Sequence, residues 1–144
     1  RPCILGGVHI ESGLGPDGHS DADVLIHALM DAMLGAAGLR DIGYYFPPED
    51  DQYKGISSML LLEKVNFLLK ERGLQAYNID IMVISETPKL KPHIDMMKAN
   101  LQSILEIPLD RISIKATTNE MLGAIGRREG IAAQAVVSVY EGEI

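Results

Sequence analysis

The stretch HSDADVLIHALMDAMLGAAG, His19 to Gly38, decides the fold expected for this sequence. Its Ala, Leu, Val, Ile and Met residues recur at helical spacing, which predicts a largely buried helix that begins near Ser20 and ends at Gly38. Ser20 is a typical N-cap residue, and Asp23 follows three residues later in a variant of the capping box. The same apolar stretch carries two histidines and three aspartates. These titratable side chains are the first candidates for a functional site.

Asp23, His27 and Asp31 follow one another in four-residue steps, so they form one polar stripe along the predicted helix. His27 is a candidate metal ligand, and Asp23 is a candidate for orienting its imidazole. A solvated polar face is the alternative, and the helix alone favours it because isolated histidines are more often structural. Asp31 is expected to be structural. His19 stands where a helix start favours an anion, so a phosphate contact and an exposed loop histidine both stay open.

Composition limits the classes of function. The 144 residues fit one domain, and 47% hydrophobic residues supply a core without disulfides. The net charge of −7, with no run among the 13 Lys and Arg residues, argues against a nucleic-acid partner. No apolar run reaches the ~20 residues of a membrane span, so we expect a soluble protein without membrane contact. The single cysteine, Cys3, is expected to be a buried apolar side chain.

The remaining patterns alternate between strand and helix, which predicts one α/β domain of the α+β type, with a small sheet packed against helices. We expect strands at 3–10, 77–84, 112–117 and 131–140, helices at 57–72 and 88–105, and a helical turn from 118. The segment RDIGYYFPPEDDQYKG, Arg40 to Gly55, is expected to be irregular. A loop of that length in a small domain is more often functional than idle.

Two further segments carry candidate phosphate ligands. In ISETPKLKPHID, Pro88 marks a predicted helix start after a strand, and Lys89, Lys91 and His93 would suit a phosphate there. A solvated basic turn is the alternative, and the segment alone favours it.

In IKATTNEMLGAIGRREGIA, Thr117, Thr118 and Glu120 follow a strand and could hold a diphosphate with its divalent cation. Thr117 and Glu120 also match a capping box, which is preferred for the motif alone. The turn from Gly126 to Gly130, which contains Arg127 and Arg128, either carries solvated charges or directs a guanidinium at phosphate.

The segments HSDADVLIHALMDAMLGAAGLRDIGYYFP, YKGISS, ETPKLKPHI, KATTNEMLG and GRREGIA occur in this order along the chain. In this order and spacing the sequence resembles the methylerythritol cyclodiphosphate synthase family of the non-mevalonate isoprenoid pathway, from CILGGV to the final strand. The resemblance implies a mostly antiparallel or mixed sheet, a homotrimer with its sheets around the three-fold axis, and active sites at subunit interfaces. It implies cyclisation of 4-CDP-2-C-methyl-D-erythritol 2-phosphate to the 2,4-cyclodiphosphate, with release of CMP.

The resemblance also assigns roles to single residues. It implies that His27 binds zinc, that Glu120 serves magnesium or manganese, and that His19 and Thr118 stabilise the transition state. Substrate contacts are implied for His19, Ser20, Asp41, Ile42, Gly43, Phe46, Pro47, Pro48, Glu49, Asp50, Ser85, Glu86, Thr87, Pro88, Lys89, Leu90, Lys91, Thr117, Thr118, Asn119, Glu120, Ala124 and Arg127. Residues 41–43 would meet the sugar and 85–91 the cytidine. Arg127 would lie near the trimer axis, where a central cavity could hold an isoprenoid diphosphate.

The sequence departs from the family pattern in two places. The family has an Asp-x-His pair, the two other zinc ligands, upstream of the stretch that begins here at Arg1. We therefore expect one domain over 1–144 that lacks this segment of a longer, fully active protein. Ala124 stands where an aromatic residue is common, so the apolar contact near Arg127 is not carried over. A bacterial cytoplasm is favoured over a plastid, since no transit peptide precedes the match.

Two other classes of function stay open at this point. One is a catalytically silent trimer that binds a cytidine nucleotide or an isoprenoid diphosphate. The other is a metal-dependent phosphohydrolase, which would give a linear product.

Overall fold

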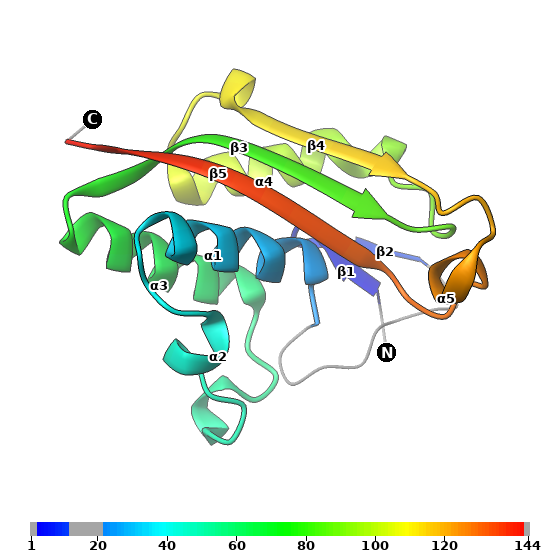
Figure 1. Cartoon of the computed structure of the whole chain (residues 1–144), viewed down its shortest axis with the longest axis horizontal. Coiled ribbons are helices and arrows are strands. Elements are labelled where there is room, and N and C mark those ends of the chain that lie inside the picture. The colour runs from blue at the N-terminus through cyan, green and yellow to red at the C-terminus, as the bar shows by residue number, and fades with distance from the viewer. Residues whose placement is uncertain (1–2, 12–21, 143–144) are drawn as a thin grey trace.

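The centre of the molecule is a three-stranded sheet in the order β4-β3-β5 (Figure 1). The structure is a computed structural model that describes residues 3–11 and 22–142. The central strand β3 (Leu74–Ile84) runs parallel to β4 (Ile112–Thr117) and antiparallel to β5 (Ala132–Glu141). The predicted mixed sheet is thus confirmed, and β3 begins three residues earlier than expected.

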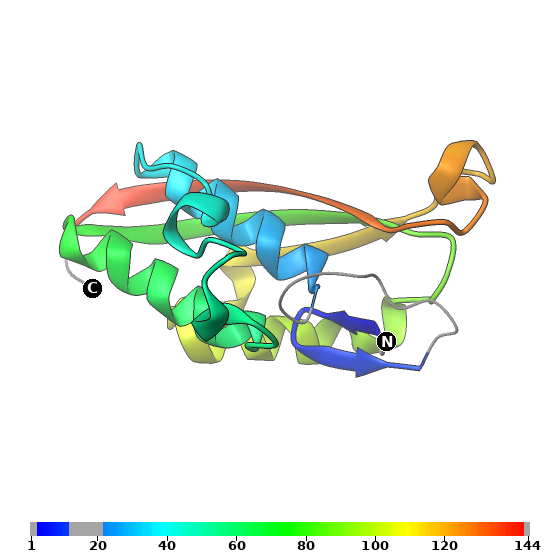
Figure 2. The same cartoon turned by 90° about the horizontal axis from the view of Figure 1, so that it is seen from below.

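Three helices cover one face of this sheet (Figure 2). They are α1 (Val24–Ala36), α3 (Ser58–Glu71) and α4 (Ile94–Leu105). From Ile79 onward, past an irregularity between Ala76 and Asn78, every second residue of β3 is buried against them. The fully buried side chains of this core include Leu25, Leu29, Met33, Leu62, Leu69, Ile79, Ile81, Met97 and Leu101. No helix in the described part of the chain combines the length and the apolar character that a membrane crossing needs.

The start of α1 differs from the prediction. The N-cap is Asp23, whose carboxylate accepts the Ile26 N–H at 3.1 Å, so the helix begins at Val24. The predicted cap Ser20 lies outside the described residues. Asp23 also accepts the N–H groups of Gly6 and Gly7, at 3.0 and 2.8 Å. One carboxylate therefore both caps the helix and fastens the N-terminal segment to it.

That segment is a hairpin, where the sequence predicted one strand interrupted by glycines. Its strands are β1 (Cys3–Leu5) and β2 (Val8–Ile10), paired antiparallel. Gly6 and Gly7 have φ of +57° and +75°, the left-handed pair that a tight two-residue hairpin turn requires. Their N–H groups consequently point at Asp23.

The loop between α1 and α3 is more regular than expected. It contains the short helix α2 (Ile42–Tyr45) and the 3-10 turn η1 (Asp51–Tyr53). Asp31 accepts the Ile42 N–H at 2.8 Å and so satisfies a free donor at the start of α2. The structural role expected for Asp31 is confirmed.

Two predicted helix starts are wrong. After the cis peptide Thr87–Pro88 comes the 3-10 turn η2 (Lys91–His93), and α4 begins only at Ile94. A second proline, Pro92, explains the delay, because the residue before a proline is steered away from helical angles.

No helix begins at Thr118. Glu120 and Met121 adopt left-handed φ of +50° and +62°, which the proposed capping box does not allow. The short helix α5 (Gly123–Gly126) follows later, and another turn, η3 (Leu109–Arg111), precedes β4.

Candidate functional site

The predicted site segments meet where the parallel strands β3 and β4 end. Ile84 pairs with Thr117 in register, so residues 85–91 and 117–120 leave the sheet side by side. The Ser85 N–H donates to the Thr117 carbonyl at 2.9 Å. The two segments are 32 residues apart at this hydrogen bond, and the strand register alone brings them together.

Two adjoining hollows open between these segments. The first has a volume of about 180 Å³ and is lined by Ser85, Pro88, Lys89, Leu90, Lys91, Ala116, Thr117 and Thr118. The second has a volume of about 770 Å³ and is lined by Glu86, Lys89, Thr118, Glu120, Met121, Gly126, Arg127 and Arg128. Lys89 and Thr118 line both hollows. The segment implied to hold cytidine and the residues implied to hold phosphate therefore share one site.

The second hollow has the charge that a diphosphate with a cation would need. Lys89, Arg127 and Arg128 supply positive charge, which opposes the repulsion between phosphate groups. Glu120 supplies a carboxylate, the hard oxygen donor that magnesium and manganese prefer. The lining thus suits a polyanion more than an apolar ligand.

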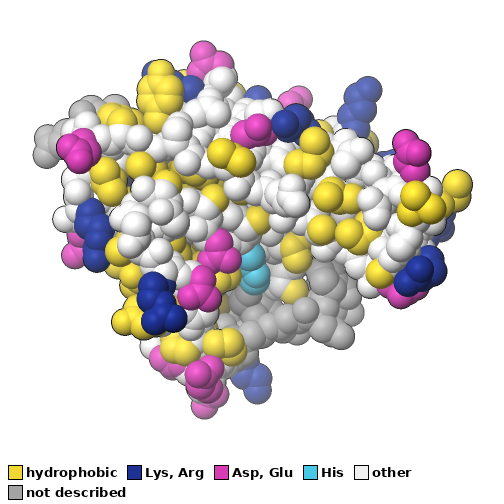
Figure 3. Space-filling view, viewed as in Figure 1, with side chains coloured by type: hydrophobic (Ala, Val, Ile, Leu, Met, Phe, Trp, Pro, Cys, Tyr) yellow, Lys and Arg dark blue, Asp and Glu magenta, His cyan; other side chains and the backbone are white. Residues whose placement is uncertain are grey.

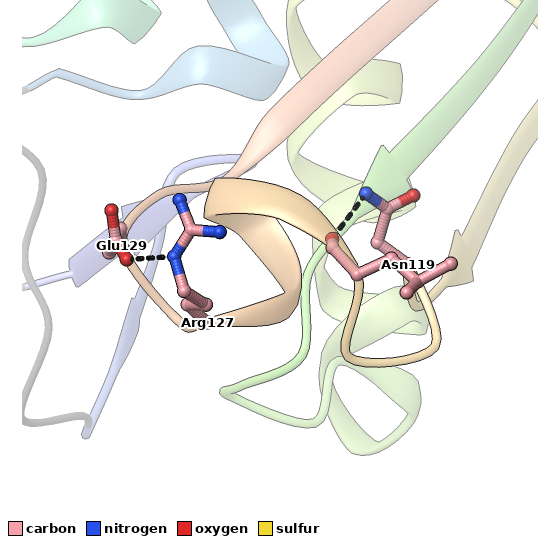
Figure 4. Close-up of polar contacts among 4 residues, drawn as sticks. Asn119, Arg127 and Glu129 are labelled. Carbon is pink, nitrogen blue, oxygen red and sulfur yellow. Dashed lines mark hydrogen bonds and ion pairs between the residues drawn. The ribbon is translucent and has the colours of Figure 1, made fainter.

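Local hydrogen bonds shape the loop that carries Thr118 and Glu120. The Glu120 N–H donates to Thr118 Oγ1 at 3.2 Å, which leaves the hydroxyl hydrogen of Thr118 for an external acceptor. Asn119 Nδ2 donates to the Leu122 carbonyl at 2.9 Å. Figure 4 shows this contact on one side of α5 and the ion pair of Arg127 with Glu129 on the other. On the face shown in Figure 3, apolar and charged side chains gather at the end of the molecule that carries α5.

His27 lies at a third hollow, of about 150 Å³. It shares this hollow with Ile42, Gly43, Phe46, Pro48, Tyr53 and Leu61. Its Nε2 is 3.0 Å from Ser58 Oγ at the start of α3. The histidine therefore faces the segment that the resemblance assigns to the sugar of the substrate.

The described residues do not by themselves complete a zinc site. Catalytic zinc takes about three protein ligands. Among residues 3–11 and 22–142, no group of three His, Cys, Asp or Glu side chains is arranged to hold a metal ion. The carboxylate of Asp23, one turn before His27, is completely buried and accepts three backbone N–H groups. His27 is thus the one member of the implied zinc ligand set in this part of the chain.

Several predicted residues lie elsewhere or outside the described part. His19 and Ser20 fall outside it. Other implied contacts lie in the same segments without lining any of the three hollows: Asp41, Pro47, Glu49, Asp50, Thr87, Asn119 and Ala124. Asp50 instead accepts the backbone and side-chain N–H groups of Gln52, and these bonds lower the pKa of its carboxyl.

Sequence reasoning gave no role to Tyr53, Leu61, Ala116 and Met121, which line these hollows, or to Ser58, which contacts His27. Ser58 belongs to the YKGISS segment, which carried the resemblance but received no role. Its position immediately after the N-cap Ser57 was the available signal, because a helix start fixes where that side chain points.

Comparison with known proteins decides the family. The model of the YgbB family matches residues 1–140. This chain belongs to the YgbB family. The YgbB protein is 59% identical over 136 residues to the 2-C-methyl-D-erythritol 2,4-cyclodiphosphate synthase of Synechococcus elongatus, covering 94% of this chain and 85% of that protein. It is 57% identical over 142 residues to the synthase of Thermosynechococcus vestitus, covering 99% and 88%.

Solved structures agree with this assignment. A 2C-methyl-D-erythritol-2,4-cyclodiphosphate synthase in its CDP-bound form superposes on the YgbB chain with a TM-score of 0.89 at 36% identity, covering 97% of this chain and 91% of that one. A bifunctional protein from Campylobacter jejuni superposes with a TM-score of 0.94 at 44% identity, and the match covers 99% of this chain and 39% of that longer one. The α+β fold with a small mixed sheet is therefore the fold of these proteins.

Proposed function

We propose that this YgbB protein cyclises 4-CDP-2-C-methyl-D-erythritol 2-phosphate to 2-C-methyl-D-erythritol 2,4-cyclodiphosphate in isoprenoid precursor biosynthesis, as a phosphorus–oxygen lyase. An oxygen of the 2-phosphate attacks the β-phosphorus of the same molecule. The bond from that phosphorus to the bridging oxygen breaks, and CMP leaves with the bridging oxygen. No atom of water or protein enters either product.

One observation carries the proposal, namely the meeting of residues 85–91 and 117–120 at the ends of β3 and β4. A nucleoside diphosphate needs a base site next to a cationic phosphate site, and Lys89 borders both hollows there. The CDP-bound form of a relative with this fold supports the assignment of a cytidine nucleotide.

Each side chain contributes to holding two anionic groups in line. Residues 85–91 form the wall around the cytidine, and Lys89 offsets phosphate charge beside it. The Thr118 hydroxyl donates to a phosphate oxygen, and His19 and Ser20, which precede α1 in the sequence, contact phosphate as well. Residues 41–43 and 46–50 meet the sugar. Fixing attacking and leaving groups within one site removes much of the entropic barrier to their reaction.

Two divalent cations belong to this proposal. Glu120 serves magnesium or manganese, and His27 serves zinc, whose two other ligands we assign to an Asp-x-His pair upstream of Arg1. When bound, such cations polarise phosphate oxygens and stabilise the charge that develops on them. His27 would hold its cation beside the hollow that it shares with Ile42 and Gly43.

A homotrimer with active sites between subunits completes the proposal. Its support is the sheet face turned away from α1, α3 and α4, which carries the Asp80–Lys115 ion pair at 2.9 Å and Val136 with 72% of its surface exposed. In a trimer these faces surround the axis, with Arg127 near a central cavity for an isoprenoid diphosphate. A bacterial cytoplasm is the proposed location, and the cyanobacterial relatives fit both a bacterium and a plastid.

The test incubates the full-length protein with the CDP substrate and magnesium or manganese, and follows products by chromatography and mass spectrometry. We expect CMP and the cyclic diphosphate in equal amounts. Absence of CMP would contradict the proposal, and nucleotide binding without turnover would favour a silent binding protein instead.

A further inference from the structure

We propose that Glu86 is a positioning residue whose carboxylate holds the loop 118–122 in the shape that presents Thr118 and Glu120 to one hollow. This inference rests on the proposed function and deepens it. The resemblance implies only a substrate contact for the segment that contains Glu86. Its hydrogen bonds give it a different task.

The carboxylate of Glu86 binds the loop with both oxygens. Oε2 accepts the Asn119 N–H at 2.6 Å, and Oε1 accepts the Met121 N–H at 3.2 Å. The two N–H groups bracket Glu120, whose side chain lines the larger hollow. Hydrogen bonds to a charged acceptor are the stronger class, and two of them fix orientation as well as distance.

The backbone on both sides of Glu86 is held in place by hydrogen bonds. Its neighbour Ser85 is buried and donates its N–H to the Thr117 carbonyl, the last residue of β4. Ser85 Oγ also donates to the Thr87 carbonyl at 2.7 Å. Because both flanks of Glu86 are anchored, its carboxylate can hold the loop and does not simply follow it.

The loop needs such a hold because its own conformation is unfavourable. Glu120 and Met121 have left-handed φ of +50° and +62°, a conformation that is unfavourable for residues other than glycine. Burial does not repay this cost, since Met121 and Leu122 expose 79% and 69% of their surface. The loop also lies directly on α5, where a Cβ on Gly126 would be 2.1 Å from the Met121 carbonyl carbon. Glu86 holds the loop on one side and Gly126 leaves room for it on the other.

This arrangement joins base recognition to phosphate chemistry. Glu86 belongs to the segment proposed to hold cytidine, while the groups it positions act on phosphate and cation. If the carboxylate is lost, Thr118 and Glu120 should still be present but misplaced. A misplaced catalytic group slows the chemical step more than it weakens binding of the remote base.

The experiment compares Glu86→Ala and Glu86→Gln with Glu63→Ala, an exposed control on α3, all in the full-length protein. Without substrate, amide hydrogen exchange should be slow at Asn119 and Met121 in the parent and in the control. Glu86→Ala should lose protection at both amides. Glu86→Gln has one acceptor oxygen and should lose protection at one of the two amides. In turnover, Glu86→Ala should lower kcat about tenfold, keep KM for the nucleotide within about twofold, and raise the half-saturating manganese concentration about tenfold.

Three results for Glu86→Ala would overturn the inference. The amide protection could stay unchanged, or the protection could be lost while kcat stays unchanged. A raised KM with an unchanged kcat would make Glu86 a substrate contact. Gly126→Ala approaches the same loop from α5 and should reproduce both the faster exchange and the higher manganese requirement. An inactive parent would contradict the proposed function, while the exchange measurement would still test how Glu86 holds the loop.

Discussion

Two carboxylates in this molecule perform the same hydrogen-bonding task in opposite surroundings. Asp23 accepts three backbone N–H groups between the hairpin and α1 and is completely buried. Glu86 accepts two from the loop 118–122 beside an open hollow. Donors buried with Asp23 have no water to turn to, whereas the loop amides at Glu86 do. The same interaction should therefore control stability at Asp23 and activity at Glu86.

The largest effect is expected for Asp23→Ala. It leaves the buried N–H groups of Gly6 and Ile26 and the partly buried N–H group of Gly7 without their acceptor, and each unsatisfied buried donor costs about 1–3 kcal/mol. We expect the free energy of unfolding to fall by about 4 kcal/mol in denaturant titration, allowing for non-additivity.

Cys3 provides a second measurement of the same change. It is buried in β1, and burial, with a smaller contribution from the charge of Asp23, raises the pKa of its thiol. A protonated buried thiol reacts slowly, so a thiol reagent should label Cys3 faster in Asp23→Ala. Asp23→Asn keeps one acceptor oxygen, so its labelling rate at Cys3 should lie between those of the parent and of Asp23→Ala. If Asp23→Ala lowered the free energy of unfolding by less than about 1 kcal/mol, the contrast with Glu86 would not hold.

A smaller effect is expected for Asp31→Ala. Asp31 is exposed and accepts one N–H, from Ile42 at the start of α2. Losing a cap of this kind costs about 1 kcal/mol, so we expect the free energy of unfolding to fall by about that amount in denaturant titration. Asp31→Asn retains an acceptor and should match the parent. A loss as large as that of Asp23→Ala would show that burial is not what separates the two aspartates.

The comparison also explains what the sequence could and could not predict. The alternation of strands and helices and the buried face of α1 follow from hydrophobic period, whereas the mixed sheet was implied only by the resemblance. The meeting of residues 85–91 with 117–120 comes from the register of β3 with β4, which no local pattern shows. The capping box at Thr117 failed because Glu86, 33 residues before Asn119, holds the loop in another shape. The predicted helix start near Ser20 was wrong because Asp23 caps α1 through the local Ile26 N–H. Local patterns predict local hydrogen bonds, whereas the contacts of Glu86 with Asn119 and of Asp23 with Gly6 and Gly7 join residues distant in sequence.

The central claim is that a phosphate of the substrate, and not water, attacks the β-phosphorus. The most direct test runs the reaction of the full-length protein in water enriched in heavy oxygen and weighs both products by mass spectrometry. Cyclisation predicts CMP and a cyclic diphosphate that contain no oxygen from the solvent. Heavy oxygen in either product, together with an uncyclised 2,4-bisphosphate heavier than the cyclic product by one water, would contradict the account and identify a hydrolase.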